Sequence, residues 1–301
     1  MTINTRLQYK IKLLQMKNIV LLPLILLSLS VFSQNKEVYK IFLGDGRVSS
    51  YDSLLNACKD ASFVFFGEQH DNPIAHWLEY ELTVDLYKFR KNELVVGAEM
   101  FEADNQLILC EYLQGKISDK KFEEEARLWP NYKTDYKPFM QYCKENKIPF
   151  IATNIPRRYA SMVHYKGLDV LDSLSSEAKS YIAPLPINYD DSISYYKNML
   201  KEMDNEHATP NIPKAQAIKD ATMAYFILRN HKRGELFLHF NGSHHSNNHQ
   251  GIVTYLKAEK KKFKVIVINT VTQKNISTLS DEIKYTGDFI ICVTENMTKT
   301  Y

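Results

Sequence analysis

The sequence predicts an α/β fold: a mostly parallel central sheet, helices on both faces, and an inserted helical cap. Short, continuously apolar runs such as residues 63–66 and 94–98 alternate with longer amphipathic segments. Strands that are apolar on both sides are typical of a parallel sheet buried between helices. Residues 167–212 break this alternation with tyrosine-rich helical stretches and prolines, which indicates an insertion. The 45% apolar content of 301 residues supplies the core of one large domain.

The first 33 residues are predicted to be a secretory signal peptide. Met16 and Lys17 precede an apolar run at residues 19–32, which is short for a membrane span, and Ser33-Gln34 offers a small residue for cleavage. An uncleaved anchor is the alternative interpretation. We expect cleavage near Ser33-Gln34 and a single mature domain of residues 34–301, in the periplasm or at the cell surface.

Removal of this leader changes the charge of the chain. Four of the 38 basic residues, and no acidic ones, precede the apolar run, so the mature chain has 34 basic residues against 35 acidic ones. The mature chain therefore has no net positive charge that would favour nucleic acid as a partner. The four cysteines include no Cys-x-x-Cys pair, so neither a zinc knuckle nor a redox motif is predicted, although export would permit a disulfide.

The first two strands are predicted to form an edge hairpin, because Gly44-Asp45-Gly46 between them supplies the positive φ angles of a tight turn. The other predicted strands are the apolar runs that follow along the chain. In order, the strands lie at residues 40–43, 48, 63–66, 94–98, 149–152, 235–240, 265–268 and 289–293.

The predicted helices lie between these strands. Pro73 suits the first turn of one of them, where its missing N–H group costs nothing. In the helix at residues 213–229, alanines recur at helical spacing, so packing explains most of that face. In order, the helices lie at residues 51–57, 73–88, 105–113, 120–127, 139–145, from 157, 213–229 and 251–258.

Polar side chains follow four of the predicted strands: Glu68 with His70, then Glu99, Asn154 and His245. Because the carboxyl ends of parallel strands meet at one edge of a sheet, we expect these residues to converge. Two neutral imidazoles with a carboxylate could hold zinc or iron, so His70, Glu99 and His245 are the predicted metal ligands. Glu68 and Glu99 are the candidates to act on a metal-bound water in a hydrolase, and their spacing leaves the two roles open.

Each of these residues also has a structural interpretation. A histidine after a strand often binds backbone groups in a loop, and Glu68 could cap the following helix. The glycines that precede His70 and His245 in Gly-x-x-His patterns favour function, because glycine allows a close backbone approach. Glu99 directly follows an apolar strand, where burial of a carboxylate without a partner is costly. His76, on the same side of its helix as Glu79, is either a supporting residue or a surface residue.

The successive motifs of the chain resemble those of the ChaN family of haem-binding uptake proteins, in the Tiki/TraB superfamily. The resemblance covers about residues 62–256, in the family's order. The motifs that carry it are Gly67-Glu68-Gln69-His70-Asp71-Asn72-Pro73, Gly97-Ala98-Glu99-Met100-Phe101, Ala152-Thr153-Asn154-Ile155-Pro156-Arg157, Ala215-Gln216, Asp220-Ala221-Thr222-Met223-Ala224 and Gly242-Ser243-His244-His245.

This resemblance implies a site at the sheet rim, a role in haem or iron uptake at the cell surface, an outer-membrane receptor as a partner and a homodimer around the ligand. It implies two different chemistries. Family members are associated with haem bound through a tyrosine, whereas other superfamily members resemble divalent-metal-dependent hydrolases that use the paired histidines and a glutamate. Whether the chain is an enzyme stays open at this point.

The chain departs from the family pattern after His245, where residues 246–250 replace the aromatic residues of many relatives. The resemblance therefore leaves His249 or a tyrosine of the cap to ligate haem iron, beside His70, His245, Asn154 and Arg157 as haem-binding residues. Arg157 and Arg158 could hold the propionates. The candidate tyrosines in or beside the cap are Tyr132, Tyr136, Tyr159, Tyr165, Tyr189, Tyr195 and Tyr196. No lipoprotein cysteine follows the leader.

Overall fold

Eight strands form one sheet, in the order β2-β1-β8-β7-β3-β6-β4-β5. β3 lies at its centre and pairs in parallel with β6 and β7, and the β4–β5, β4–β6 and β7–β8 pairs are parallel as well. The strands are β1 (Tyr39–Leu43), β2 (Val48–Ser49), β3 (Phe63–Glu68), β4 (Leu94–Glu102), β5 (Phe150–Asn154), β6 (Leu236–Gly242), β7 (Val265–Gln273) and β8 (Phe289–Thr294). The predicted α/β fold is confirmed.

The computed structural model describes residues 36–202, 209–259 and 262–301, together with Gln8 and Lys10. Its contacts divide the chain into Met1–Glu37 and Val38–Tyr301. The predicted leader and its cleavage site therefore lie outside the described residues, apart from Gln8 and Lys10. Within the described part of the chain, no helix is long and apolar enough to cross a bilayer.

The hairpin predicted at the sheet edge is present. β1 pairs antiparallel with β2 and with β8, so the two-residue strand β2 ends the sheet on that side. Gly46 has a φ of +90°, the conformation that the Asp-Gly turn predicts.

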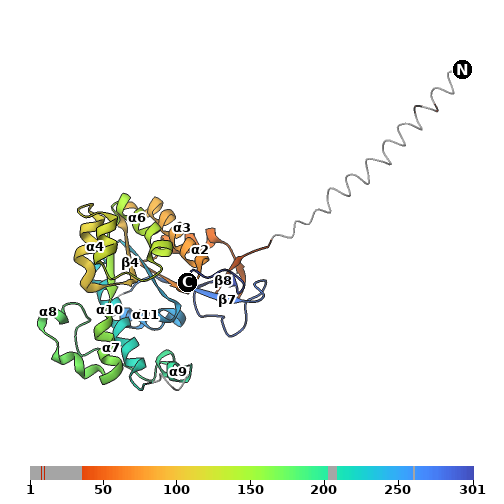
Figure 1. Cartoon of the computed structure of the whole chain (residues 1–301). Helices are drawn as coiled ribbons and strands as arrows, with labels where there is room; N and C mark the ends of the chain where they lie inside the picture. The colour runs from red at the N-terminus through yellow and green to blue at the C-terminus, as the bar shows by residue number, and fades with distance from the viewer. Residues whose placement is uncertain (1–7, 9, 11–35, 203–208, 260–261) are drawn as a thin grey trace. The chain divides into compact units, whose positions relative to one another are not determined.

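Helices cover the two faces of the sheet (Figure 1). Successive strand residues point to opposite faces, so Val64 and Phe66 of β3 pack with α2–α6, whereas Phe63 and Phe65 pack with α10 and α11. The helices are α2 (Tyr51–Lys59), α3 (Pro73–Arg90), α4 (Gln106–Leu113), α5 (Asp119–Glu125), α6 (Lys137–Glu145), α7 (Arg157–Lys166), α8 (Ser176–Lys179), α9 (Ser194–Glu202), α10 (Ile212–Asn230) and α11 (Ile252–Ala258).

Helix α3 begins where the sequence indicates, directly after the first rim motif. Asn72 accepts hydrogen bonds at Oδ1 from the backbone N–H groups of Ile74 and Ala75, and Pro73 fills the first helical turn. This cap fixes the direction in which the chain leaves β3. It thereby places His76 and Glu79, one and two turns into the helix, beneath the end of that strand.

The predicted cap consists of short helical segments after α7. A separate apolar cluster, which includes Tyr159, Leu171 and Ile182, joins this region to Ile218 and Ala221 of α10. Helix α10 also packs against α7 and β5. The cap is therefore attached to the sheet through α10, whose small side chains allow close contact, as the alanine spacing predicts.

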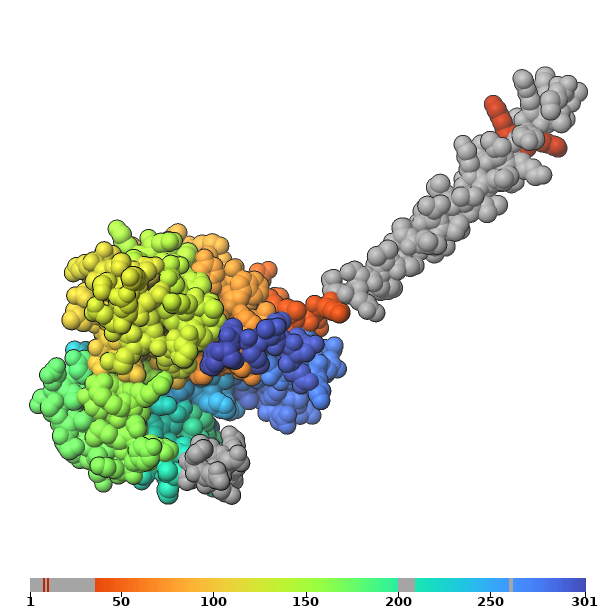
Figure 2. All heavy atoms as spheres, in the orientation of Figure 1, coloured from red at the N-terminus to blue at the C-terminus, as the bar shows by residue number. Residues whose placement is uncertain are grey.

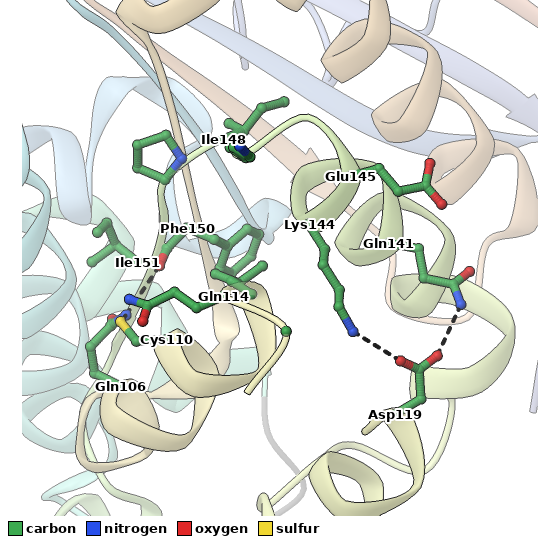
Figure 3. Close-up of a pocket in the computed structure, with 14 residues that line it drawn as sticks. Gln106, Cys110, Gln114, Asp119, Gln141, Lys144, Glu145, Ile148, Phe150 and Ile151 are labelled. Atoms are coloured by element: carbon green, nitrogen blue, oxygen red, sulfur yellow. Dashed lines mark hydrogen bonds and ion pairs between the residues drawn. The ribbon is translucent and has the colours of Figure 1, made fainter. Parts of the chain in front are cut away.

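The opposite edge of the sheet, β5, is covered by a side chain. Gln106 at the start of α4 donates from Nε2 to the carbonyl oxygen of Phe150 (3.1 Å) and accepts at Oε1 from the N–H of Ala152 (2.7 Å). This amide satisfies the two backbone groups that an adjacent strand would bind. A cavity of about 860 Å³ lies beside it, and Asp119 accepts hydrogen bonds there from Gln141 and Lys144 (Figure 3).

Candidate functional site

The carboxyl ends of the central strands bring the predicted rim residues together. Glu68 is the last residue of β3, beside Gly242 of β6, and Asn154 ends β5. Glu99 lies in β4 where its register with β5 shifts, an irregularity that redirects side chains at a strand end. His245 lies in the turn directly after β6.

Glu99 and His245 form the centre of the rim. Nε2 of His245 lies 3.1 Å from Oε1 of Glu99, and Oε2 of Glu99 accepts from the N–H of Gly242 at 2.8 Å. Nδ1 of His245 lies 2.5 Å from Oδ1 of Asp220 on α10. Tyr196 donates to the other oxygen of Asp220 (2.9 Å). His245 is therefore held between two buried carboxylates.

The electrostatics of this group follow from its burial and its close charges. Burial alone would lower the pKa of His245, but Glu99 and Asp220 raise it to about 9. Burial alone would raise the pKa of Glu99, but His245, His70 and Lys219 hold it well below its usual range. For Asp220 burial dominates and the pKa is raised. Glu99 is thus the anion and His245 the cation of a buried pair at neutral pH.

His70 lies on the other side of the same strand end. Its Nδ1 lies 2.7 Å from Oε1 of Glu68, and that oxygen also accepts from the hydroxyl of Tyr136 at 2.7 Å. Burial would lower the pKa of His70, but its hydrogen bond to Glu68 and the charge of Glu99 raise it. Because Nδ1 is occupied by Glu68, any ligand of this ring would bind at Nε2.

A cavity of about 480 Å³ opens from the rim towards the cap. Its lining comes from His70, from residues 99–129, and from residues 154–165 together with α10. Figure 2 shows the corresponding segments, yellow to yellow-green and green, next to each other on the face in view. Its lining residues are His70, Glu99, Glu102, Trp129, Asn154, Ile155, Arg157, Ala160, Ser161, His164, Tyr165, Ala215 and Lys219.

Of the seven tyrosines predicted as candidates, Tyr165 lines this cavity. It is 73% exposed. The hydroxyls of Tyr136 and Tyr196 are instead hydrogen-bonded to buried carboxylates. Burial, and then the charge of a close acidic group, raises the pKa of each of them. Tyr132 is buried as well. A tyrosinate is therefore much harder to form at these three positions.

Two further predicted residues have different surroundings. Asn154 donates to the carbonyl oxygen of Glu99 (2.9 Å), and its Oδ1 atom is buried with no hydrogen-bond partner among the described residues. His249 does not line the rim cavity. Its Nε2 lies 3.2 Å from Oδ2 of Asp288, at the connection between β7 and β8.

The structure brings Glu99 and His245 into contact and places His70 beside them. Among the residues that the structure describes, a different group of three has its possible metal-ligand atoms within 4.8 Å of one another: Glu68, His76 and Glu79. The sequence predicted a catalytic role for Glu68 and left His76 as a supporting or a surface residue, but it gave no role to Glu79. Nor did it give one to Asp220, which orients His245.

Comparison with known proteins places this geometry in a family. Residues 54–256 match the model of the family described as haem-binding uptake, Tiki superfamily, ChaN. The chain belongs to this family. The predicted resemblance is confirmed, and Glu68, Glu99, Asn154, Asp220 and His245 all lie within the matched segment.

The chain is similar to a solved structure from one organism and to a protein sequence from another. The structure is similar to one described as cofacial heme binding to ChaN of Campylobacter jejuni, with a TM-score of 0.62 and 18% identity, over 85% of this chain and 97% of that one. The chain is also 23% identical, over 202 residues, to the chloroplastic protein RETICULATA-RELATED 5 of Arabidopsis thaliana. The matched part covers 62% of this chain and about a quarter, 26%, of that relative.

Proposed function

We propose that this ChaN family protein binds haem in the rim cavity and serves haem or iron uptake outside the cytosol. One observation carries the proposal: the rim of a haem-binding family fold opens into a cavity lined by an exposed tyrosine, two cationic side chains and apolar groups. Its volume of about 480 Å³ lies within the usual range for a small-molecule or cofactor site.

The donor groups around the cavity suit haem. Tyr165 offers a phenol oxygen, and tyrosinate is one of the protein ligands of haem iron. His70 also lines the cavity and offers Nε2. Trp129 and Ile155 supply apolar and aromatic surface, as a porphyrin ring requires. We assign Tyr165 as the first candidate for the iron ligand, because it reaches the cavity without being committed to a buried carboxylate.

The propionates of haem need cations, and two line the cavity. Arg157 begins α7 at one wall, and Lys219 extends from α10 close enough to lower the pKa of Glu99. Arg158, the other arginine considered from the sequence, is bound to Asp104 at 2.6 Å. Arg157 and Lys219 are therefore the proposed partners of the propionates.

The location and partners are part of the same proposal. A leader that ends near Ser33-Gln34 would export the chain to the periplasm or the cell surface, where it would exchange haem with an outer-membrane uptake receptor. The Campylobacter jejuni relative is described by cofacial heme binding. The high exposure of Tyr165 is consistent with a second copy of the chain packing over the haem site, as a homodimer around the ligand would require.

Titration of the purified mature chain with haemin tests the proposal. We expect a saturable shift of the Soret band, one haem per chain, and a weaker shift when Arg157→Ala and Lys219→Ala are combined. Because both side chains reach the cavity surface, circular dichroism should show that the double variant stays folded. Absence of a saturable shift at micromolar protein would contradict haem binding. An unchanged affinity in the double variant would contradict this cavity as the site.

A divalent-metal hydrolase is the second candidate, because His245 is held like a metal-bound histidine. One of its nitrogens contacts a carboxylate on α10, and the other lies 3.1 Å from Glu99, the separation expected for two ligands of one ion. The test is hydrolysis of a panel of esters, lactones and peptides with and without added Zn²⁺. Metal-dependent turnover that is lost in Glu99→Gln would support this candidate, and equal turnover in that variant would exclude it.

A further inference from the structure

A second polar cluster lies beneath the rim, between β3 and the first turns of α3. Glu68, His76 and Glu79 are 2%, 5% and 0% exposed, and their possible ligand atoms lie within 4.8 Å of one another. His76 and Glu79 are three residues apart on the same face of α3. Asp135, from the π-helical turn Tyr132–Tyr136, adds a third carboxylate next to the cluster. So many buried acids require compensation by positive charge.

Nε2 of His76 can carry the ring proton, because it faces two oxygens that accept hydrogen bonds. Nε2 lies 3.0 Å from the carbonyl oxygen of His70 and 3.4 Å from Oδ2 of Asp135, and both of these oxygens accept hydrogen bonds. With the proton on Nε2, Nδ1 carries a lone pair. This lone pair faces Oε2 of Glu79 at 3.3 Å and Oε2 of Glu68 at 3.5 Å. Three electron-rich atoms thus surround one point.

Two carboxylate oxygens of the cluster have no N–H or hydroxyl donor among the described residues, although the carboxyl groups of Glu68 and Glu79 lie close enough to share a proton. They are Oε2 of Glu68, the atom that faces His76, and Oε1 of Glu79, and both are buried. By contrast, Oε1 of Glu68 accepts from Tyr136 and lies 2.7 Å from Nδ1 of His70. These bonds turn the free oxygen of Glu68 into the cluster, the role that outer hydrogen bonds have around metal-bound carboxylates.

The separations match those of ligands around one ion. Nitrogen and oxygen ligands bind Zn²⁺ at about 2.0–2.2 Å, so two ligands at a tetrahedral angle stand about 3.4 Å apart. Nδ1 of His76 lies 3.3 Å from Glu79 and 3.5 Å from Glu68, and the ligand atoms of all three residues lie within 4.8 Å of one another. We propose that Nδ1 of His76, Oε2 of Glu68 and a carboxylate oxygen of Glu79 bind a divalent transition-metal ion, with zinc as the best match to these donors.

We assign the fourth position and the entry path to a small cavity that His76 lines, although Glu68 and Glu79 do not. Its volume is about 260 Å³, and it brings solvent to the edge of His76 between α3 and the π-helical turn. A zinc site with three protein ligands and one open position has this form. The lining residues are Pro73, His76, Trp77, Tyr80, Thr134, Asp135 and Pro138.

A proton is the competing explanation for the same cluster. Burial, and then the charge of Glu68 and a hydrogen bond with it, raises the pKa of Glu79 well above its usual range, so a proton shared by these two carboxyl groups would also satisfy them. The two explanations differ for Glu79→Gln, which has the shape of the neutral acid. If only a proton is present, this variant should resemble the wild type. If a metal ion binds, it should lose the ion.

The experiment measures zinc in the haem-free mature chain by mass spectrometry of the metal, after loading with ZnCl2 and dialysis. The pyridine haemochrome assay separates haem iron from the bound ion. We expect one zinc per chain in the wild type and in His245→Asn, with a rise in melting temperature that EDTA reverses. For Glu79→Gln we expect loss of the zinc and of this rise, with Zn²⁺ affinity reduced by more than about 100-fold.

Three results would overturn the proposal. They are a wild type that retains no zinc after loading, a Glu79→Gln variant that retains one zinc per chain, and zinc lost in His245→Asn but kept in Glu79→Gln. The last would place the ion at the rim. His76→Asn provides a second ligand variant, and circular dichroism of both variants in EDTA separates loss of the ion from loss of the fold. Because the protein is free of haem throughout, the outcome is independent of the proposed haem site.

Discussion

The α-carbon of Gly242 lies against the imidazole ring of His70. A Cβ atom at this position would stand 2.9 Å from both Cε1 and Nε2 of the ring and 3.5 Å from Oε2 of Glu99. The backbone of Gly242, with φ −55° and ψ 139°, is open to any residue, so the need for glycine here is steric. Close packing of β6 on β3 thus sets where the His70 ring can lie.

Gly242→Ala should therefore displace His70 without straining the backbone. We expect a loss of about 1–3 kcal/mol in the free energy of unfolding, measured with urea, because the added methyl overpacks the rim. Haemin affinity should fall as well if His70 borders the haem. In the His70→Ala background the same substitution should cost much less. An equal cost in both backgrounds would mean that the methyl clashes with something other than this ring.

Stability should depend on pH through His245. Its pKa is raised in the folded chain to about 9, against about 6.5 when unfolded. Its contribution is therefore complete below about pH 6.5 and is lost as the pH rises through 9, with a total of about 3 kcal/mol. Urea unfolding of the wild type from pH 6 to 9.5 should show this decline. His245→Asn should be less stable at pH 6 and should lack the decline, and parallel pH profiles would refute the buried ion pair.

The edge of β5 offers a test of the fold that is independent of the site. Gln106→Ala removes both hydrogen bonds to the strand edge, at Phe150 and Ala152. We expect a loss of about 1–3 kcal/mol in urea unfolding, because two buried backbone groups lose their partners. Gln141→Ala, which removes a bond to Asp119 at the same cavity, should change stability by less than about 0.5 kcal/mol. Equal effects would show that Gln106 does not protect the edge.

The sequence was sufficient to predict the sheet, and also that the site residues meet at one edge of it, because both follow from where the strands lie along the chain. Apolar runs alternate with amphipathic helices, and residues that end parallel strands meet at one edge whatever their separation along the chain. Glu68, Asn154 and His245 were found by this rule, whereas Glu99, predicted directly after its strand, lies within β4 and reaches the rim where the register with β5 shifts. The rule depends only on where strands end, so the order of strands in the sheet was not needed to place them.

Residues contributed by helices escaped prediction, because the packing of a helix decides what its polar side chains contact. Asp220 and Glu79 are both fully buried. A signal was present in each case: Asp220 lies on the same face of its helix as Ala217, Ala221 and Ala224, and Glu79 shares a face with Ala75 and Leu82. An acid on the packed face of a helix requires a partner, and here the partners are His245 and His76. Similarly, Tyr165 could be told apart from the other candidate tyrosines only because it lines the rim cavity, which the sequence does not show.

Arg157 and Lys219 should contribute to haemin affinity through charge. We expect Arg157→Ala and Lys219→Ala each to weaken haemin binding about twofold to fivefold, because an exposed cation paired with a propionate contributes up to about 1 kcal/mol. Binding should also weaken as salt is raised from 0.05 to about 0.5 M, less steeply in the variants. Titration with haemin dimethyl ester, which keeps the iron but lacks the two free carboxylates, is the control. If each variant loses as much affinity for the ester as for haemin, relative to the wild type, the effect is not due to charge.

The haemin spectrum of Tyr165→Phe tests the central claim most directly, with Tyr285→Phe as its control. Tyr165 and Tyr285 are similarly exposed, at 73% and 71%, but only Tyr165 lines the rim cavity. Each variant is titrated with haemin, and the charge-transfer band of ferric haem bound to tyrosinate is measured. We expect this band to be lost in Tyr165→Phe and kept in Tyr285→Phe. An unchanged band in Tyr165→Phe would contradict this expectation.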